Sequence, residues 1–110
     1  MGGDREMASM PMTEAMYYIL LAVTRPCHGY AMMGRIHDLS GGRLEMGPGT
    51  LYGVLTRMKK DGWIDLREDD GRRKIYEITA LGRELLFEEH CRLQRLVTDG
   101  IAVLEGGDAE

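Results

Sequence analysis

The segment GPGTLYGVLTRMKKDGW, residues 47–63, carries residue types that suit contact with phosphate. Its apolar residues keep helical spacing, although glycine costs a helix about 1 kcal/mol relative to alanine. The glycines and cations of the segment are Gly47, Gly49, Gly53, Arg57, Lys59 and Lys60. Glycine lets a backbone approach a ligand closely, and the free N–H groups at a helix start favour phosphate. The segment therefore predicts a helix whose outer side meets phosphate groups.

A second basic cluster, RRK at 72–74, lies in a predicted hairpin. WIDLRE (63–68) and RKIYEIT (73–79) alternate apolar and polar residues, and the charged turn DDGR (69–72) lies between them. Two short alternating runs joined by such a turn predict antiparallel strands. The second cluster is therefore expected at the tip of a hairpin that follows the glycine-rich helix.

The net charge of −4 does not exclude a nucleic-acid partner, because the charges are unevenly distributed along the chain. Residues 1–42 carry −1, residues 43–76 carry +2 and residues 77–110 carry −5. Local charge, rather than the total, decides where phosphate binds. The positive segment is the one that holds both basic clusters.

Three helices are expected before the hairpin and one after it. Thr13 is the expected N-cap of an apolar helix that runs to about residue 24, and the second helix covers 29–39. Pro48 begins the third helix, and Thr79 caps a last helix that runs to residue 104. The second helix is expected to point Tyr30, Met33, Ile36 and His37 inward. The third is expected to bury Leu51, Val54, Leu55 and Met58.

This order of elements predicts the fold class: mainly α (α+β), a winged helix-turn-helix with a two-stranded β-wing and a long C-terminal dimerisation helix. In such folds the third helix enters the DNA major groove and the hairpin touches the flanking backbone. The expected division is a flexible arm (1–12), a DNA-binding domain (13–78), a dimerisation helix (79–104) and a flexible tail (105–110).

The last helix carries an apolar stripe that so short a chain has little other protein to cover. Its members recur at nearly heptad spacing: Leu86, His90, Leu93, Val97, Ile101 and Leu104. The first helix, with Met16 on its apolar stripe, is also apolar on more than one side. Both features predict a homodimer. The alternative is that the last helix folds back on its own domain.

The motifs HGY (28–30), GPGTLYGVLTRMKKDGWI (47–64) and RRKIYEIT (72–79), with the ALGRE that follows, resemble the PadR family of transcriptional regulators. The likeness is to the short subtype with one C-terminal helix, and it covers nearly everything from Met12 to about Leu96. It implies a homodimeric winged-helix repressor, without a cofactor, that a small hydrophobic or phenolic effector releases. A two-fold dimer implies a pseudo-palindromic operator in double-stranded DNA.

The expected DNA contacts combine the exposed positions of the third helix with positions that the resemblance implies. On the third helix they are Gly49, Thr50, Tyr52, Thr56, Arg57, Lys59 and Lys60. On the wing they are Arg72, Arg73 and Lys74. The resemblance also implies a contact between Tyr17, in the first helix, and the DNA backbone.

A candidate effector pocket between subunits comprises Met16, Tyr18, Phe87 and His90, with plain core packing as the alternative. Some short relatives in the family stack flat aromatic drugs on a tryptophan of the last helix. The one tryptophan here, Trp63, begins the wing, and core packing is expected for it.

The sequence also bears on redox, metal-binding, enzymatic and protein-binding functions. Cys27 and Cys91 match no metal-ligand spacing and are expected to be free thiols, with a redox sensor as the alternative. No metal site is expected, and no nucleophile motif or phosphate-binding glycine loop indicates an enzyme. The remaining rival is a winged helix that binds protein and no operator. Since no apolar run could span a bilayer and no signal sequence is recognised, the expected location is the cytoplasm.

Overall fold

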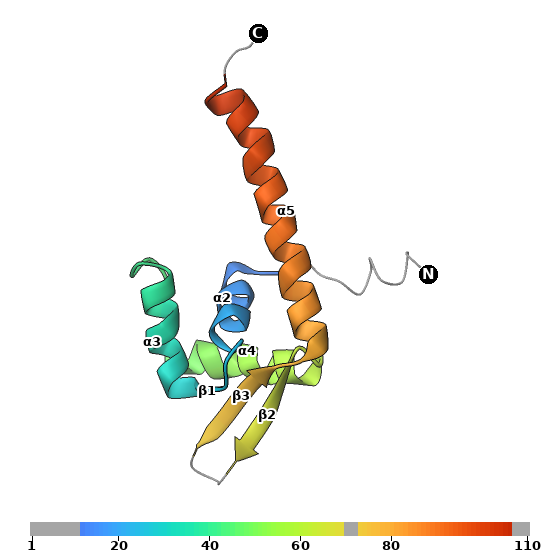
Figure 1. Cartoon of the computed structure of the whole chain (residues 1–110). Coiled ribbons are helices and arrows are strands. Elements are labelled where there is room, and N and C mark those ends of the chain that lie inside the picture. The colour runs from blue at the N-terminus through green and yellow to red at the C-terminus, as the bar shows by residue number, and fades with distance from the viewer. Residues whose placement is uncertain (1–11, 70–72, 107–110) are drawn as a thin grey trace.

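The computed structural model describes residues 12–69 and 73–106. The predicted arm up to residue 11, the wing residue Arg72 and the tail beyond residue 106 therefore lie outside the described residues. The elements are α2 (Glu14–Ala22), β1 (Cys27–His28), α3 (Gly29–Leu39), α4 (Pro48–Lys60), β2 (Ile64–Asp69), β3 (Lys74–Ile78) and α5 (Ala80–Leu104). The predicted winged-helix architecture is confirmed (Figure 1). The division into domains at residue 79 stays a prediction.

The helix boundaries follow from capping residues. The Thr13 hydroxyl accepts a hydrogen bond of 3.1 Å from the backbone N–H of Met16 and so caps α2. The Thr79 hydroxyl caps α5 in the same way, accepting from the N–H of Gly82 at 3.0 Å. Pro48 occupies the first position of α4, where its missing N–H costs no intrahelical bond. Both predicted caps and the predicted start of α4 are confirmed.

The wing is a three-stranded antiparallel sheet in the order β1-β3-β2. The predicted hairpin forms β2 and β3. The third strand, β1, pairs Cys27 with Tyr76 and His28 with Ile75. Two residues are too few to show an alternating pattern, so β1 left no signal in the sequence. Its effect is to tie the start of α3 to the wing.

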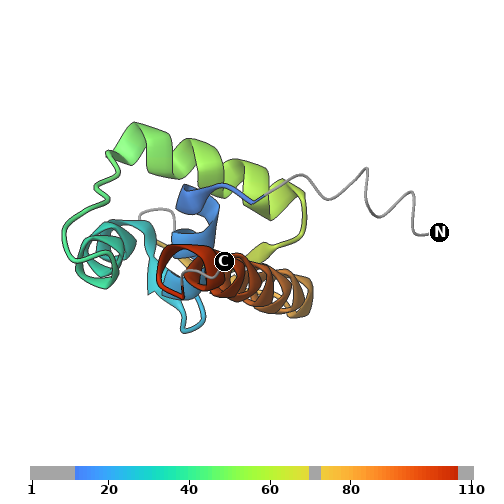
Figure 2. The same cartoon turned by 90° about the horizontal axis from the view of Figure 1, so that it is seen from above.

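The core gathers around α2, which lies between α3 and α5 (Figures 1 and 2). Its fully buried large side chains are Ile19, Leu20, Val23, Met32, Ile36, Leu51, Leu55, Met58 and Ile64. The predicted inner stripe of α4 is confirmed, with Val54 half-buried at its edge. Trp63 is half-buried and packs against this core, as predicted.

The inner side of α3 was predicted wrongly at two positions. Tyr30 is 81% exposed, and His37 lies at the surface with its Nδ1 3.2 Å from Oε2 of Glu45. The buried residues of α3 are instead Gly29, Met32 and Ile36. Adjacent apolar residues at 32 and 33 allow two stripes one residue apart, and a buried glycine gives no hydrophobic signal to decide between them.

The long helix α5 begins in close contact with the wing and ends beyond the rest of the fold (Figure 1). A Cβ at the buried Gly82 would collide with the backbone carbonyl oxygen of Trp63 and lie 3.0 Å from Cγ1 of Ile78. Glycine at this position therefore lets the first turn of α5 rest directly on the wing backbone. The same carbonyl accepts a 3.1 Å hydrogen bond from the N–H of Thr79, which fixes the start of the helix.

Candidate nucleic-acid interface

One side of α4 is buried in the core. The other side is exposed and carries glycines in its first turns and basic residues in its last turns. Leu51, Leu55 and Met58 are fully buried and hold the helix in place. The glycines Gly47, Gly49 and Gly53 are exposed, and a Cβ at any of them would meet no atom within 4 Å. Packing within the described residues therefore does not require these glycines.

The cations of α4 stand in its last turns. Arg57 makes an exposed ion pair with Asp61, with 3.5 Å between Nε and Oδ2. Lys59 and Lys60 are exposed, and their side chains form no ion pair with another described residue. An exposed pair such as Arg57–Asp61 contributes little stability, so its arginine remains available to a phosphate partner.

The polar residues of α4 differ in how firmly they are held. Thr50 is exposed near the helix start. Tyr52 is 41% exposed and lies partly against the first residue of α3, Gly29. The Thr56 hydroxyl donates a hydrogen bond of 2.8 Å to the backbone carbonyl of Tyr52, so its oxygen retains only its acceptor role for a further partner.

The predicted wing contacts lie at the end of the sheet. Arg73 and Lys74 are both exposed, where β3 begins. Arg72 lies outside the described residues. Because only residues 61–63 separate α4 from β2, a short connection joins α4 directly to the wing. The role of these residues in DNA binding stays a prediction.

Tyr17, in α2, lies against α5. Its hydroxyl lies 2.9 Å from Nδ1 of His90. Burial raises the pKa of the Tyr17 phenol, with a further contribution from the nearby Glu89 carboxylate. The phenol is therefore protonated at neutral pH, and the tautomer of His90 decides which of the two groups donates the hydrogen bond. Its predicted DNA contact stays a prediction.

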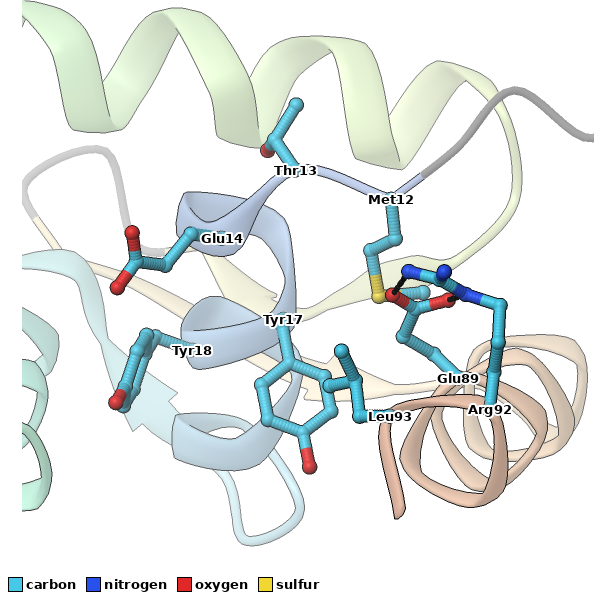
Figure 3. A pocket seen from close by; sticks show the side chains of 8 residues that line it. All are labelled: Met12, Thr13, Glu14, Tyr17, Tyr18, Glu89, Arg92 and Leu93. Carbon is cyan, nitrogen blue, oxygen red and sulfur yellow. Dashed lines mark hydrogen bonds and ion pairs between the residues drawn. The ribbon is translucent and has the colours of Figure 1, made fainter. Parts of the chain in front are cut away.

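A pocket of about 360 Å³ opens between the start of α2 and the middle of α5 (Figure 3). It is lined by Met12, Thr13, Glu14, Tyr17, Tyr18, Glu89, Arg92 and Leu93. Of the residues predicted for an effector pocket only Tyr18 lines it, and Met16, Phe87 and His90 do not. Phe87 is 67% exposed. The i, i+3 spacing of Glu89 and Arg92 indicates a helical ion pair, but it gives no signal for a pocket.

Two ion pairs border the pocket. Arg92 donates a 2.9 Å hydrogen bond from Nε to Oε1 of Glu89, and this bond lowers the pKa of the Glu89 carboxyl. Arg43 pairs with Glu14 and donates a 3.1 Å hydrogen bond to the Tyr18 hydroxyl. Arg43 belongs to the segment between α3 and α4, so these contacts join the pocket wall to the segment that leads into α4.

The predicted seam on α5 divides into two parts. Leu86 is buried and Leu93 half-buried, on the half of α5 that packs near α2. The outer half of the seam is uncovered, with Val97, Ile101 and Leu104 at 60%, 45% and 84% exposed. No described element covers this outer half, so folding back on its own domain, the alternative to a dimer, does not account for it.

Comparison with known proteins identifies the family of this chain. Residues 19–88 match the family described as "Transcriptional regulator PadR-like family". The chain belongs to the PadR-like family of transcriptional regulators. Its family and structural neighbours are regulators and not enzymes.

The relatives of this PadR-like chain include longer proteins. It is 39% identical over 88 residues to an uncharacterized 37.1 kDa protein in transposon TN4556 of Streptomyces fradiae, matching 79% of this chain and 25% of that protein. It is 27% identical over 96 residues to the transcriptional regulator YqjI of Escherichia coli, matching 86% of this chain and 46% of the relative. The chain thus spans less than half the length of these two relatives.

Solved structures share the fold. A PadR family transcriptional regulator from Eggerthella lenta has a TM-score of 0.70 at 23% identity, covering 96% of this chain and 98% of its own. The PcaV transcriptional regulator of Streptomyces coelicolor, in complex with its natural ligand, has a TM-score of 0.68 at 22% identity. That match covers 91% of this chain and 68% of PcaV.

Among residues 12–69 and 73–106, no helix has the length and apolar character needed to cross a bilayer. The same residues contain no group of three or more His, Cys, Asp or Glu side chains placed to hold a metal ion. Cys27 and Cys91 are free thiols, as predicted, and burial raises the pKa of Cys27.

Proposed function

We propose that this PadR-like chain binds a specific operator as a homodimer and represses transcription until a small-molecule effector releases it. The observation that carries the proposal is the exposed side of α4. Its glycines leave the backbone uncovered although packing within the described residues does not require them, and its last turns supply Arg57, Lys59 and Lys60. A partner that approaches the backbone closely and carries negative charge accounts for both features.

The start of α4 supports the same partner. Gly47, the N-cap, makes no side-chain capping hydrogen bond, and Pro48 follows it. The N–H groups of the first turn and the positive end of the helix dipole are therefore open to an anion. We infer that the phosphate backbone lies along the glycine side of α4, while Thr50 and Tyr52 face base edges or adjacent phosphates.

The outer half of α5 supports a homodimer. Its exposed apolar side chains are Leu96, Val97, Ile101, Val103 and Leu104. Exposed apolar surface of this kind marks an interface, and a second copy of α5 carries a matching stripe. Two copies related by a two-fold axis would place two α4 helices about one DNA turn, about 34 Å, apart, and so read a pseudo-palindrome.

The pocket between α2 and α5 supports regulation by a small hydrophobic or phenolic effector. Met12, Leu93 and two tyrosines offer it apolar and aromatic surface, and Glu89 and Arg92 offer polar contacts. The hydrogen bond from Arg43 to Tyr18 links an effector in this pocket to the segment before α4. A ligand that moves Tyr18 acts on the segment that leads into α4.

The test is binding to DNA from upstream of the gene that encodes this chain, measured by fluorescence anisotropy. The wild type is compared with Tyr52→Ala and with Lys59→Ala/Lys60→Ala. Arg95→Ala, which removes an exposed cation from α5, is the control for a general loss of positive charge. We expect the first two variants to lose affinity and the control to keep it. If the folded wild type binds no DNA, the result favours a winged helix that binds protein.

A further inference from the structure

Gly29, the first residue of α3, is buried beneath the aromatic ring of Tyr52 from α4. A Cβ at this position would lie 2.7 Å from Cζ and 2.8 Å from Cε1 of Tyr52, well inside contact distance. The backbone itself does not demand glycine here, because the described residues with positive φ are Gly41, Gly42 and Gly62. The missing side chain at position 29 therefore makes room for the Tyr52 ring.

The place of this contact in the fold matters for DNA recognition. Gly29 directly follows β1, where His28 pairs with Ile75 of the wing strand β3. The Tyr52 ring thus lies where α4, the start of α3 and the wing sheet come together. A side chain held at this junction has a fixed direction relative to both parts of the interface.

Tyr52 is only partly enclosed. Its side against Gly29 is enclosed, yet 41% of the residue remains exposed on the outer side of α4. An aromatic side chain that is already ordered loses less entropy when it binds a partner. The room left by Gly29 therefore orders a residue that is expected to contact DNA.

We propose that Gly29 is a positioning residue for DNA recognition, because the absence of its side chain lets Tyr52 lie against α3 and present its outer edge to DNA. The inference rests on the proposed function. It assigns Gly29 a role that depends on Tyr52 and not on the stability of the fold.

Gly29→Ala separates these two roles. The atoms in the way belong to the far end of a side chain with two rotatable bonds, so Tyr52 can swing outward without a shift of the backbone. The midpoint of thermal unfolding should change little, while affinity for the upstream DNA falls about tenfold because the ordered ring is lost. Gly34→Ala is the matched control in the same helix, since a Cβ there meets no atom within 4 Å in the part of the chain that the structure describes. It should keep wild-type affinity.

A double-mutant comparison tests whether Gly29 acts through Tyr52. In a Tyr52→Ala chain, adding Gly29→Ala should cause no further loss of affinity. The proposal is overturned if Gly29→Ala binds as tightly as wild type, or if it weakens binding equally with and without the Tyr52 ring. It is also overturned if NMR of the DNA-free wild type lacks cross-peaks between the Gly29 α-protons and the Tyr52 ring. A wild type that binds no DNA overturns the proposed function itself. That result is distinct from a wild type that binds DNA and a Gly29→Ala variant with unchanged affinity.

Discussion

Gly53→Ala should raise the stability of this protein and lower its affinity for DNA. Gly53 lies inside α4 and is exposed, and no atom of residues 12–69 or 73–106 lies within 4 Å of the position that a Cβ would take. Its φ is not among the positive values, so alanine fits the existing backbone. The substitution therefore adds helix propensity without any clash inside the protein.

The size of the two effects follows from the same geometry. Replacing glycine by alanine inside an exposed helix stabilises it by about 1 kcal/mol. For a domain of this length, that gain raises the unfolding midpoint by about 4 °C. On the DNA side, the new methyl group stands between the α4 backbone and the phosphates proposed to approach it. Loss of one such close contact corresponds to an affinity reduction of about tenfold.

The assay pairs thermal unfolding with anisotropy titration on the upstream DNA. Gly34→Ala, an equally open glycine in α3, is the control. It should gain similar stability and keep full affinity, because it lies off the exposed side of α4. A Gly53→Ala chain that is less stable than wild type would refute the reading of open space around α4. A stabilised chain with undiminished DNA binding would refute the close approach of the backbone to DNA.

Three further changes test other parts of the account. Gly82→Ala should destabilise the fold by about 2 kcal/mol or more in urea unfolding, because its Cβ would meet a fixed backbone carbonyl; unchanged stability would contradict this packing. Leu93→Glu together with Val97→Glu should give monomers with weak operator affinity, and a dimeric mass in light scattering would contradict the seam. Arg92→Ala should lower stability at neutral pH. Since Arg92 lowers the Glu89 pKa, this loss should shrink below about pH 4 as the carboxyl is protonated, and a constant loss would contradict the ion pair.

The helices and the hairpin could be predicted because several local signals agreed at each boundary. Thr13 and Thr79 are polar caps directly before apolar periodic runs, and Pro48 stands where only a first helical turn accepts it. The side of α3 that faces the core could not be predicted from the same kind of signal. Its buried face includes Gly29, which has no apolar side chain to mark it as buried. The neighbouring Tyr30 is aromatic and fits the spacing of a core residue, yet it is exposed.

The glycines illustrate the limit most clearly. Gly29 and Gly82 are packed against other groups, whereas Gly49 and Gly53 face open space. In the sequence all four are simply glycines within or at the start of helices. Only the three-dimensional structure separates the glycines that have close neighbours from those that face open space, and the latter are the ones proposed to meet DNA.

The pocket between α2 and α5 was anticipated only through Tyr18. Its position depends on where two helices separated by most of the chain come together, and no local pattern records that. The charged pair Glu89–Arg92 could be recognised as a helical pair from its spacing, yet its place beside Tyr17 depends on tertiary packing.

The most direct test of operator binding by α4 is the salt dependence of affinity for the upstream DNA, compared between wild type and Lys59→Ala/Lys60→Ala. Each phosphate neutralised contributes a slope of about −0.9 to log affinity against log salt concentration. If both lysines contact phosphates, the variant should bind more weakly and its slope should be shallower by about 1.8. The assignment of the exposed side of α4 to DNA would be contradicted if the wild type bound no DNA. It would also be contradicted if the double substitution left the slope unchanged.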